Sequence, residues 1–311
     1  MKYRRLGKTE LKVSVIGVGT WQFGGEWGQT FTSQEVKRLL GRAKELGINL
    51  IDTAECYGDH LSESLIGQAI EQERKAWIIA TKFGHKFPGN FERIDQWSPQ
   101  EVLQQLEASL RALCTDTIDL YQFHSGNDEI FAQDELWTML NRQVQAGKIR
   151  HLGISLSSRI DNVYQTERAT QVGASIIQVV YNRLDRSPEQ RVLPLCLEQD
   201  LGVLARVPLA SGFLSGKYQP DTVFTQSDDI RSRQDQASVQ ARLKLVQEIQ
   251  QNEVPAGVTM APWALAWCLQ HPAVTCVIPG CKTVEQVEVN ASAADLEMVR
   301  ADHPQAILQT R

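Results

Sequence analysis

The sequence predicts a (β/α)8 barrel, and three observations support this fold class. Short apolar segments alternate with longer amphipathic segments along the whole chain, which is typical of βα units in a parallel sheet. Eight of the apolar segments have the length and composition of strands. Because the chain has 311 residues and contains no linker or low-complexity segment, eight such units favour a closed barrel over an open doubly wound sheet. We therefore predict a single domain over residues 1–311.

The strands are predicted in order from the apolar runs. Residues 2–14 are expected to form an N-terminal β-hairpin with Gly7 and Lys8 at its turn. The barrel strands are expected at 13–17, 49–52, 77–82, 118–123, 149–155, 175–180, 203–207 and 273–278. A long irregular segment, 211–236, follows the seventh strand and is rich in Ser, Asp, Gln and Gly. Long loops of this kind in compact domains are usually functional.

The helices are predicted from their amphipathic pattern and from capping residues. Thr32 or Ser33 is expected to begin a helix that ends near Glu45. Ser98, followed by Pro99, begins another, since serine caps a helix and proline suits its first position. The remaining helices are expected near 62–72, 131–145, 188–199, 259–269 and 283–291.

Composition excludes several classes of function. Charged residues make up 22 % of the chain and the formal net charge is −5, so a nucleic-acid partner is not expected. No run of 18 apolar residues occurs, so no membrane span is expected. The N-terminus does not resemble a signal peptide, and the six cysteines and six histidines show no metal-binding spacing. We expect reduced thiols, no bound metal and a cytoplasmic location.

Polar residues occupy the ends of successive predicted strands, where a barrel of this kind places its active site. Asp52 ends the second strand, Tyr57 follows it, and Lys82 and His124 end the third and fourth. Asp52 and Lys82 would neutralise each other in a partly dry pocket. Lys82 would also favour the tyrosinate form of Tyr57 and lower its pKa, which suits a proton donor. One such residue alone is usually a cap or a solvated side chain, but four together indicate chemistry.

Four segments resemble signatures of the aldo-keto reductases. They are GINLIDTAECYG (47–58), IIATKFG (78–84), IDLYQFH (118–124) and GKIRHLGIS (147–155). The resemblance runs in order from Gly17 to Asn290 and therefore covers nearly the whole chain.

This resemblance implies a (β/α)8 barrel that reduces carbonyl compounds with NAD(P)H. It assigns a catalytic tetrad to Asp52, Tyr57, Lys82 and His124. Tyr57 would protonate the carbonyl oxygen, Lys82 held by Asp52 would lower the pKa of Tyr57, and His124 would orient the substrate.

The resemblance also implies a set of cofactor contacts. They are Thr20, Trp21, Ser155, Gln178, Arg206, Pro208, Leu209, Ser211, Gly212, Lys217, Gly280, Lys282, Gln286 and Asn290. Ser155 and Gln178 would hold the nicotinamide carboxamide, and 208–217 would clasp the pyrophosphate. Packing accounts for Trp21 equally well.

This chain departs from the family pattern at several of these positions. Arg206 stands where an aromatic residue is common, Leu156 where asparagine is common, and Val289 where a glutamate is common. Gln286 replaces a frequent arginine. Lys282, just before a predicted helix start, would still attract the 2′-phosphate of NADP(H), because a lysine and a helix N-terminus both favour anions.

The leading interpretation is an NADPH-dependent oxidoreductase that reduces small aldehydes or ketones. The alternative is a cofactor-binding regulatory or sensing subunit on the same barrel, resembling the potassium-channel β-subunits. A metal-assisted lyase or hydrolase is opposed by the lack of clustered ligands at the strand ends. Aromatic residues suggest an apolar substrate pocket: Phe23, Trp27, Phe83, Phe87 and Trp97.

Overall fold

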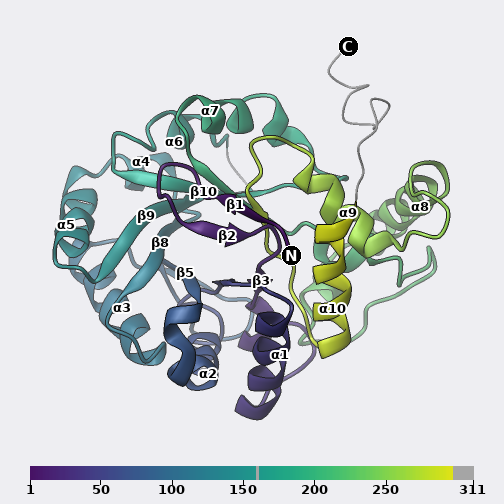
Figure 1. Cartoon of the computed structure of the whole chain (residues 1–311), viewed down its shortest axis with the longest axis horizontal. Coiled ribbons are helices and arrows are strands. Elements are labelled where there is room, and N and C mark those ends of the chain that lie inside the picture. Colours follow the sequence, from purple (N-terminus) through teal and green to yellow (C-terminus); the bar gives the residue numbers. More distant parts are fainter. Residues whose placement is uncertain (159–160, 297–311) are drawn as a thin grey trace.

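The computed structural model describes residues 1–158 and 161–296. In these residues eight parallel strands form one curled sheet (Figure 1). In spatial order they are β3 (Val18–Gly19), β4 (Leu50–Asp52), β5 (Ile78–Phe83), β8 (Ile118–His124), β9 (Ile149–Ser155), β10 (Ala174–Val180), β11 (Gly202–Arg206) and β12 (Cys276–Val277). Two parallel bridges, Ile16 with Val277 and Gly19 with Gly280, join the first strand region to the last and close the barrel.

Helices surround the sheet, as the alternating pattern predicts. They are α1 (Ser33–Glu45), α2 (Leu61–Ile70), α3 (Pro99–Ala112), α4 (Asp128–Phe131), α5 (Asp134–Gln145), α6 (Val163–Glu167), α7 (Val192–Glu198), α8 (Gln236–Asn252), α9 (Met260–Leu269) and α10 (Val284–Ser292). Short 3-10 helices are η1 (Trp21–Gly24), η2 (Glu71–Ala76), η3 (Ser187–Glu189), η4 (Ala210–Ser215), η5 (Ile230–Arg233) and η6 (Ala293–Asp295).

Capping boxes start two of these helices. Thr32 caps α1 and accepts from the Glu35 amide, while the Glu35 carboxylate accepts from the Thr32 amide. Ser98 and Glu101 make the same pair at α3, with Pro99 in the first turn. The predicted cap at Ser98 is confirmed, and at α1 the cap is Thr32.

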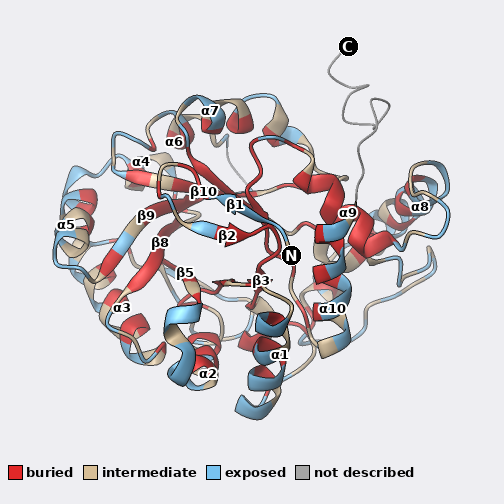
Figure 2. Cartoon of the chain, viewed as in Figure 1, coloured by how far each residue is buried: buried red, intermediate tan, exposed pale blue. Residues whose placement is uncertain are grey.

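The core lies between the helices and the sheet. Helix α1 buries one apolar stripe, whereas every residue of α9 is buried (Figure 2). The two tryptophans of α9, Trp263 and Trp267, are among the largest fully buried side chains. Their predicted role in packing is confirmed, because a helix that is apolar all round needs neighbours on every face.

The N-terminal hairpin covers one end of the barrel. Its strands are β1 (Tyr3–Arg5) and β2 (Lys12–Ser14), and Figure 1 shows it lying across the ring of strands. Arg4 donates to the carbonyl oxygens of Leu269 and Val274, at 2.9 and 2.5 Å. These residues precede β12, so the hairpin closes the end where the strands begin. The opposite end, where the strands finish, stays open for a site.

Several predicted boundaries are wrong. The first barrel strand is Val18–Gly19, while the expected strand at 13–17 is divided between β2 and the turn after it. The helix expected near 131–145 is α5, which begins at Asp134, and a separate short helix α4 precedes it. At the end of α4 the Trp137 indole nitrogen donates to the Phe131 carbonyl oxygen at 2.7 Å. The helix near 188–199 likewise divides into η3 and α7.

Three elements lie outside the predicted set. Helix α8 follows the irregular segment 211–236, which itself holds η4 and η5. Helix α6 precedes β10. A small antiparallel hairpin, β6 (His85–Lys86) and β7 (Ile94–Asp95), follows β5 and rises beside the open end of the barrel.

Candidate active site

A cavity of about 770 Å³ opens where the barrel strands end. All the predicted site residues line it except Lys82 and Ser155, which are buried directly behind its wall. Its volume lies within the usual range of ligand sites, about 300–1,000 Å³. The structure therefore brings the predicted residues together from strands that lie far apart in sequence.

Lys82 is the centre of the predicted tetrad. Its ammonium donates to Asp52 Oδ2 at 2.8 Å and to the Thr53 carbonyl at 2.6 Å, and it lies 3.5 Å from Tyr57 Oη. Its side chain is only 1 % exposed. Burial alone would lower the pKa of Lys82, but Asp52 raises it above its ordinary value. The lysine is therefore a fixed cation beside the tyrosine hydroxyl.

Tyr57 does not have the lowered pKa that the sequence predicts. Burial raises the pKa of its hydroxyl to about 12, even though Lys82 lowers it. Removing water from around a phenolate costs more free energy than the attraction of Lys82 at 3.5 Å supplies, because Asp52 neutralises part of the lysine charge. Tyr57 is therefore protonated at neutral pH and can donate a proton.

His124 lies on the other side of Tyr57, with its ring edge-on at 6.4 Å between centroids. Burial lowers the pKa of His124 to about 3, so the ring is neutral at pH 7. Its carbonyl oxygen accepts from His85 Nε2 at 2.7 Å, which ties β8 to the hairpin β6–β7. A neutral imidazole can donate or accept a hydrogen bond without adding charge to the pocket.

Gln178 and Ser155 are joined to the same network. Gln178 Nε2 donates to Asp52 Oδ1 at 2.6 Å, and Ser155 Oγ donates to Gln178 Oε1 at 3.3 Å. Gln178 lines the cavity, while Ser155 is fully buried behind it.

Trp21 is held by a carboxylate that the sequence analysis missed. Its indole nitrogen donates to Glu26 at 2.7 Å, and its ring stacks on Tyr57 at 6.0 Å between centroids. Glu26 is fully buried and also binds the Arg93 guanidinium, at 2.6 Å for the shorter contact. Both residues lie on loops, where the sequence gives no strand-end signal. Packing alone is therefore not a sufficient account of Trp21.

The expected aromatic pocket is only partly present. Trp27 lines the cavity, but Phe23, Phe83, Phe87 and Trp97 do not. Phe23 and Phe83 are fully buried in the core, and Trp97 is also buried. Arg93 and His85, from the β6–β7 hairpin and its loop, are among the polar residues that line the cavity.

Three cations gather at the far end of the cavity. Lys217, Arg231 and Lys282 all line it. Arg231 is paired with Asp229 at 2.6 Å, while Lys217 and Lys282 form no ion pair within the described residues. Burial and the nearby Arg231 lower the pKa of Lys282, whose ammonium donates to the Trp27 carbonyl. Arg231 was not predicted, because it lies in the irregular segment after β11.

The backbone after β11 makes a tight left-handed turn beside the cavity. Ala210, Ser211 and Gly212 have consecutive positive φ angles of 48, 60 and 90°, and the amides of Ala210 and Gly212 already donate to the carbonyl oxygens of Val207 and Leu209. In the cavity wall, the buried Nε of Arg206 has no hydrogen-bond partner among the described residues. This orphaned guanidinium nitrogen fits a polar group of a nicotinamide dinucleotide.

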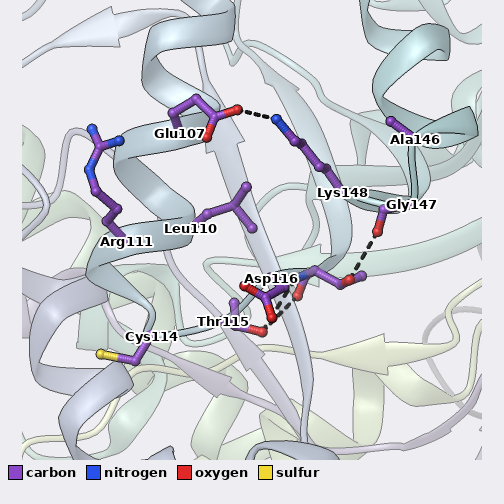
Figure 3. Close-up of a pocket in the computed structure, with 10 residues that line it drawn as sticks. Glu107, Leu110, Arg111, Cys114, Thr115, Asp116, Ala146, Gly147 and Lys148 are labelled. Carbon is purple, nitrogen blue, oxygen red and sulfur yellow. Dashed lines mark hydrogen bonds and ion pairs between the residues drawn. The ribbon is translucent and has the colours of Figure 1, made fainter.

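A second cavity, of about 630 Å³, lies where β8 and β9 begin (Figure 3). Glu107 and Lys148 pair across it, and Arg111, Cys114, Thr115, Asp116 and Thr117 also line it. None of the predicted site residues lies there.

Among the described residues, no helix is long and apolar enough to cross a bilayer.

Comparisons with known proteins agree with this geometry. The model of the "Aldo/keto reductase family" matches residues 15–306. The "NADH-specific methylglyoxal reductase" of Escherichia coli is 30 % identical over 97 % of this chain and 96 % of its own. A "probable voltage-gated potassium channel subunit beta" of Arabidopsis thaliana is 29 % identical over 95 % and 92 %. The holo form of an aldo-keto reductase from Bacillus halodurans has a TM-score of 0.81 and 31 % identity, covering 99 % and 96 %.

Proposed function

The chain belongs to the aldo/keto reductase family, and on this basis we propose that it reduces aldehydes or ketones with NADPH, using Tyr57 as the proton donor. The family places it among the NAD(P)H-dependent oxidoreductases, with small carbonyl compounds as substrates. The observation that carries the proposal is the contact of Lys82 with both Asp52 and Tyr57 at the cavity wall.

The chain's own residues account for the proton transfer. A bound reduced nicotinamide supplies the hydride that attacks the carbonyl carbon. Tyr57 Oη gives its proton to the carbonyl oxygen, so an alcohol and a tyrosinate result. Lys82 stabilises the tyrosinate at 3.5 Å, and Asp52 fixes the lysine. Water entering through the open cavity then restores the proton on Tyr57.

The other residues position and enclose the reactants. His124 and Trp21 lie on two sides of Tyr57, so they would confine the substrate carbonyl near Oη. Gln178 and Arg206 would hold the nicotinamide end of the cofactor, and the loop 208–217, much of which lines the cavity, would contact its pyrophosphate.

The preference for NADPH is supported by the cations at the far end of the cavity. The 2′-phosphate requires positive charge or several donors, and Lys217 and Lys282 are both unpaired within the described residues. Lys282 also immediately precedes Thr283, the N-cap of α10, where a helix favours anions. One relative is named as NADH-specific, so membership of the family does not by itself imply a preference for NADPH.

The alternative function is a cofactor-binding subunit that senses rather than turns over. The potassium-channel relative supports it, whereas the Asp52–Lys82–Tyr57 contacts support an enzyme. The deciding experiment follows the absorbance of NADPH and of NADH with a panel of aldehydes and ketones. Steady turnover of at least one carbonyl, faster with NADPH, is expected; cofactor binding without turnover of any carbonyl would support the sensing subunit.

A further inference from the structure

Beside the catalytic tyrosine, three groups of metal-binding type converge. Glu55, Cys56 and His124 each offer one ligand atom, and these atoms all lie within 4.8 Å of one another. His124 Nδ1 is 3.8 Å from Cys56 Sγ and 3.8 Å from Glu55 Oε2. Neither Glu55 nor Cys56 has a part in the proton transfer described above. The group joins two neighbours in sequence to a histidine 68 positions further along, so no sequence spacing could reveal it.

These separations are close to those of a tetrahedral zinc site. Zinc binds sulfur at about 2.3 Å and nitrogen or oxygen at about 2.0–2.2 Å, so its ligands lie about 3.4–3.6 Å apart. The two separations from His124 Nδ1, both 3.8 Å, exceed that range by a few tenths of an ångström, and Cys56 Sγ and Glu55 Oε2 lie within 4.8 Å of each other. Cys56 and His124 line the cavity, which gives an ion a route in and leaves its fourth position open to water.

Glu55 provides an independent sign that a cation belongs here. Its side chain is 1 % exposed, and its Oε2 has no hydrogen-bond partner among the described residues. Its other oxygen accepts from the His85 amide at 3.0 Å. A buried carboxylate oxygen without a partner is costly, and a metal ion would satisfy it.

We propose that Glu55, Cys56 and His124 form a site for Zn²⁺ that inhibits the enzyme. Binding releases the proton of the Cys56 thiol to solvent, and the thiolate and the Glu55 carboxylate then balance the two charges of the ion. Without an ion, burial and the Glu55 carboxylate raise the pKa of the Cys56 thiol well above its ordinary value, although Arg93 and Lys82 lower it, so the charge of the ion must supply the stabilisation of the thiolate. His124 is neutral, as a metal ligand must be.

The inhibitory role rests on the proposed function, whereas the binding of the ion does not. An ion on His124 Nδ1 would fix the imidazole and occupy the space where the substrate carbonyl must lie. Zn²⁺ is therefore expected to compete with the carbonyl substrate.

The test measures metal binding directly. Metal-free, fully reduced protein is dialysed against Zn²⁺, and separately titrated with Co²⁺ to observe thiolate-to-cobalt charge-transfer absorption. Wild type is expected to bind one equivalent and to show the absorption. Cys56→Ser should bind at least about 100-fold more weakly, because even loss of a residue that only supports a ligand costs about 10–100-fold. Cys114→Ser is the matched control, since Cys114 is exposed and remote, and it should bind as wild type does.

Three results would overturn the proposal. They are a wild type that binds no Zn²⁺ and shows no cobalt–thiolate absorption, equal binding by Cys56→Ser, and loss of binding in Cys114→Ser instead. The cobalt titration of wild type tests the site even if no variant folds. If Cys56→Ser does not fold, Cys56→Ala takes its place. Zn²⁺ that binds through Cys56 without slowing carbonyl reduction would refute the inhibitory role. An absence of all reductase activity, with metal binding intact, would refute the proposed function and leave the site.

Discussion

Gln178 donates a 2.6 Å hydrogen bond to Asp52, so one side chain connects the expected nicotinamide contact to the catalytic ion pair. Asp52 Oδ1 accepts this bond while Oδ2 accepts from Lys82 at 2.8 Å. Each carboxylate oxygen therefore accepts its own hydrogen bond, and the carboxylate cannot rotate without breaking one of them. The position of Lys82 beside Tyr57 therefore depends partly on a residue three strands away in the sheet.

Replacing Gln178 with alanine is expected to weaken both binding and catalysis. A neutral hydrogen bond to the nicotinamide carboxamide contributes about 0.5–1.5 kcal/mol, so its loss should raise the Kd for NADPH by up to about tenfold. The charged hydrogen bond to Asp52 contributes about 1.5–3 kcal/mol, and we expect its loss to lower kcat by about tenfold. Fluorescence titration and steady-state kinetics measure the two effects. Asn290→Ala, at the far end of the cavity, is the control, and its kcat should be unchanged. A Gln178 variant with altered Kd alone would contradict the link to Asp52.

Tyr57→Phe is expected to lower kcat by about 10²–10⁴, the usual contribution of a positioned proton donor. The ring still fills the space beside Trp21, so cofactor affinity should change little. Single-turnover measurements at saturating NADPH give the comparison. Retention of more than a tenth of wild-type kcat would rule out Tyr57 as the proton donor.

Lys82→Met is expected to reduce kcat more than Asp52→Asn does. Methionine removes the cation that stabilises the tyrosinate, whereas asparagine leaves Lys82 in place but less firmly held. Lys82→Met also leaves Asp52 buried without its partner, which costs about 3–5 kcal/mol of folding free energy. Urea denaturation checks that both variants are folded at the assay temperature. The reverse order of kcat in folded proteins would show that Asp52 has a more direct role.

Lys282→Ala is expected to weaken NADPH about tenfold or more and to leave NADH almost unchanged. A charge-assisted contact to the 2′-phosphate contributes about 1.5–3 kcal/mol, and NADH has no such phosphate. Both cofactors are titrated against both proteins by fluorescence. Equal weakening of NADH and NADPH would show that Lys282 holds another part of the cofactor, or only the Trp27 carbonyl that it contacts in this structure.

His271 is expected to make stability depend on pH. Burial lowers its pKa below 6.5, and its Nδ1 accepts from the Ala273 amide at 3.2 Å, which only the neutral ring can do. The unfolded chain therefore binds the extra proton first, so this stabilisation is complete above about pH 6.5 and is lost as the pH falls. His271→Asn keeps an acceptor but does not titrate. Between pH 7.5 and 5.5, the free energy of unfolding measured in urea should fall by about 1 kcal/mol less for His271→Asn than for wild type. Equal decreases in the two proteins would contradict this role of His271.

The meeting of Asp52, Lys82 and His124 at one end of the barrel could be predicted because they lie on regular strands. Asp52, Lys82 and His124 end apolar runs whose order along the chain is also their order around the barrel, so sequence position gives spatial position. The net pKa of Tyr57 could not be predicted, since it depends on how much water the surrounding loops exclude. Neither could the contacts of Glu26 and Arg231, because no strand or α-helix periodicity places a side chain in a loop or in the short helix η5.

The errors in the fold have related causes. Helix α8 follows the polar segment 211–236 and has only a weak apolar stripe, so its start resembles a continuation of that loop. The first barrel strand is two residues long, too short to be distinguished from the hairpin strand before it.

The narrow closure of the barrel has a consequence for how the fold opens. Only a few hydrogen bonds cross it among the described residues, including Gly17 to Val277 at 2.8 Å and Gly19 to Pro279 at 2.9 Å. Their amide protons should exchange with solvent before those of β8 and β9, whose pairing is much longer. Thr20 and Gly280 line the cavity from the two sides of this closure, so a cofactor touching both would act as a clasp across the seam and slow that exchange.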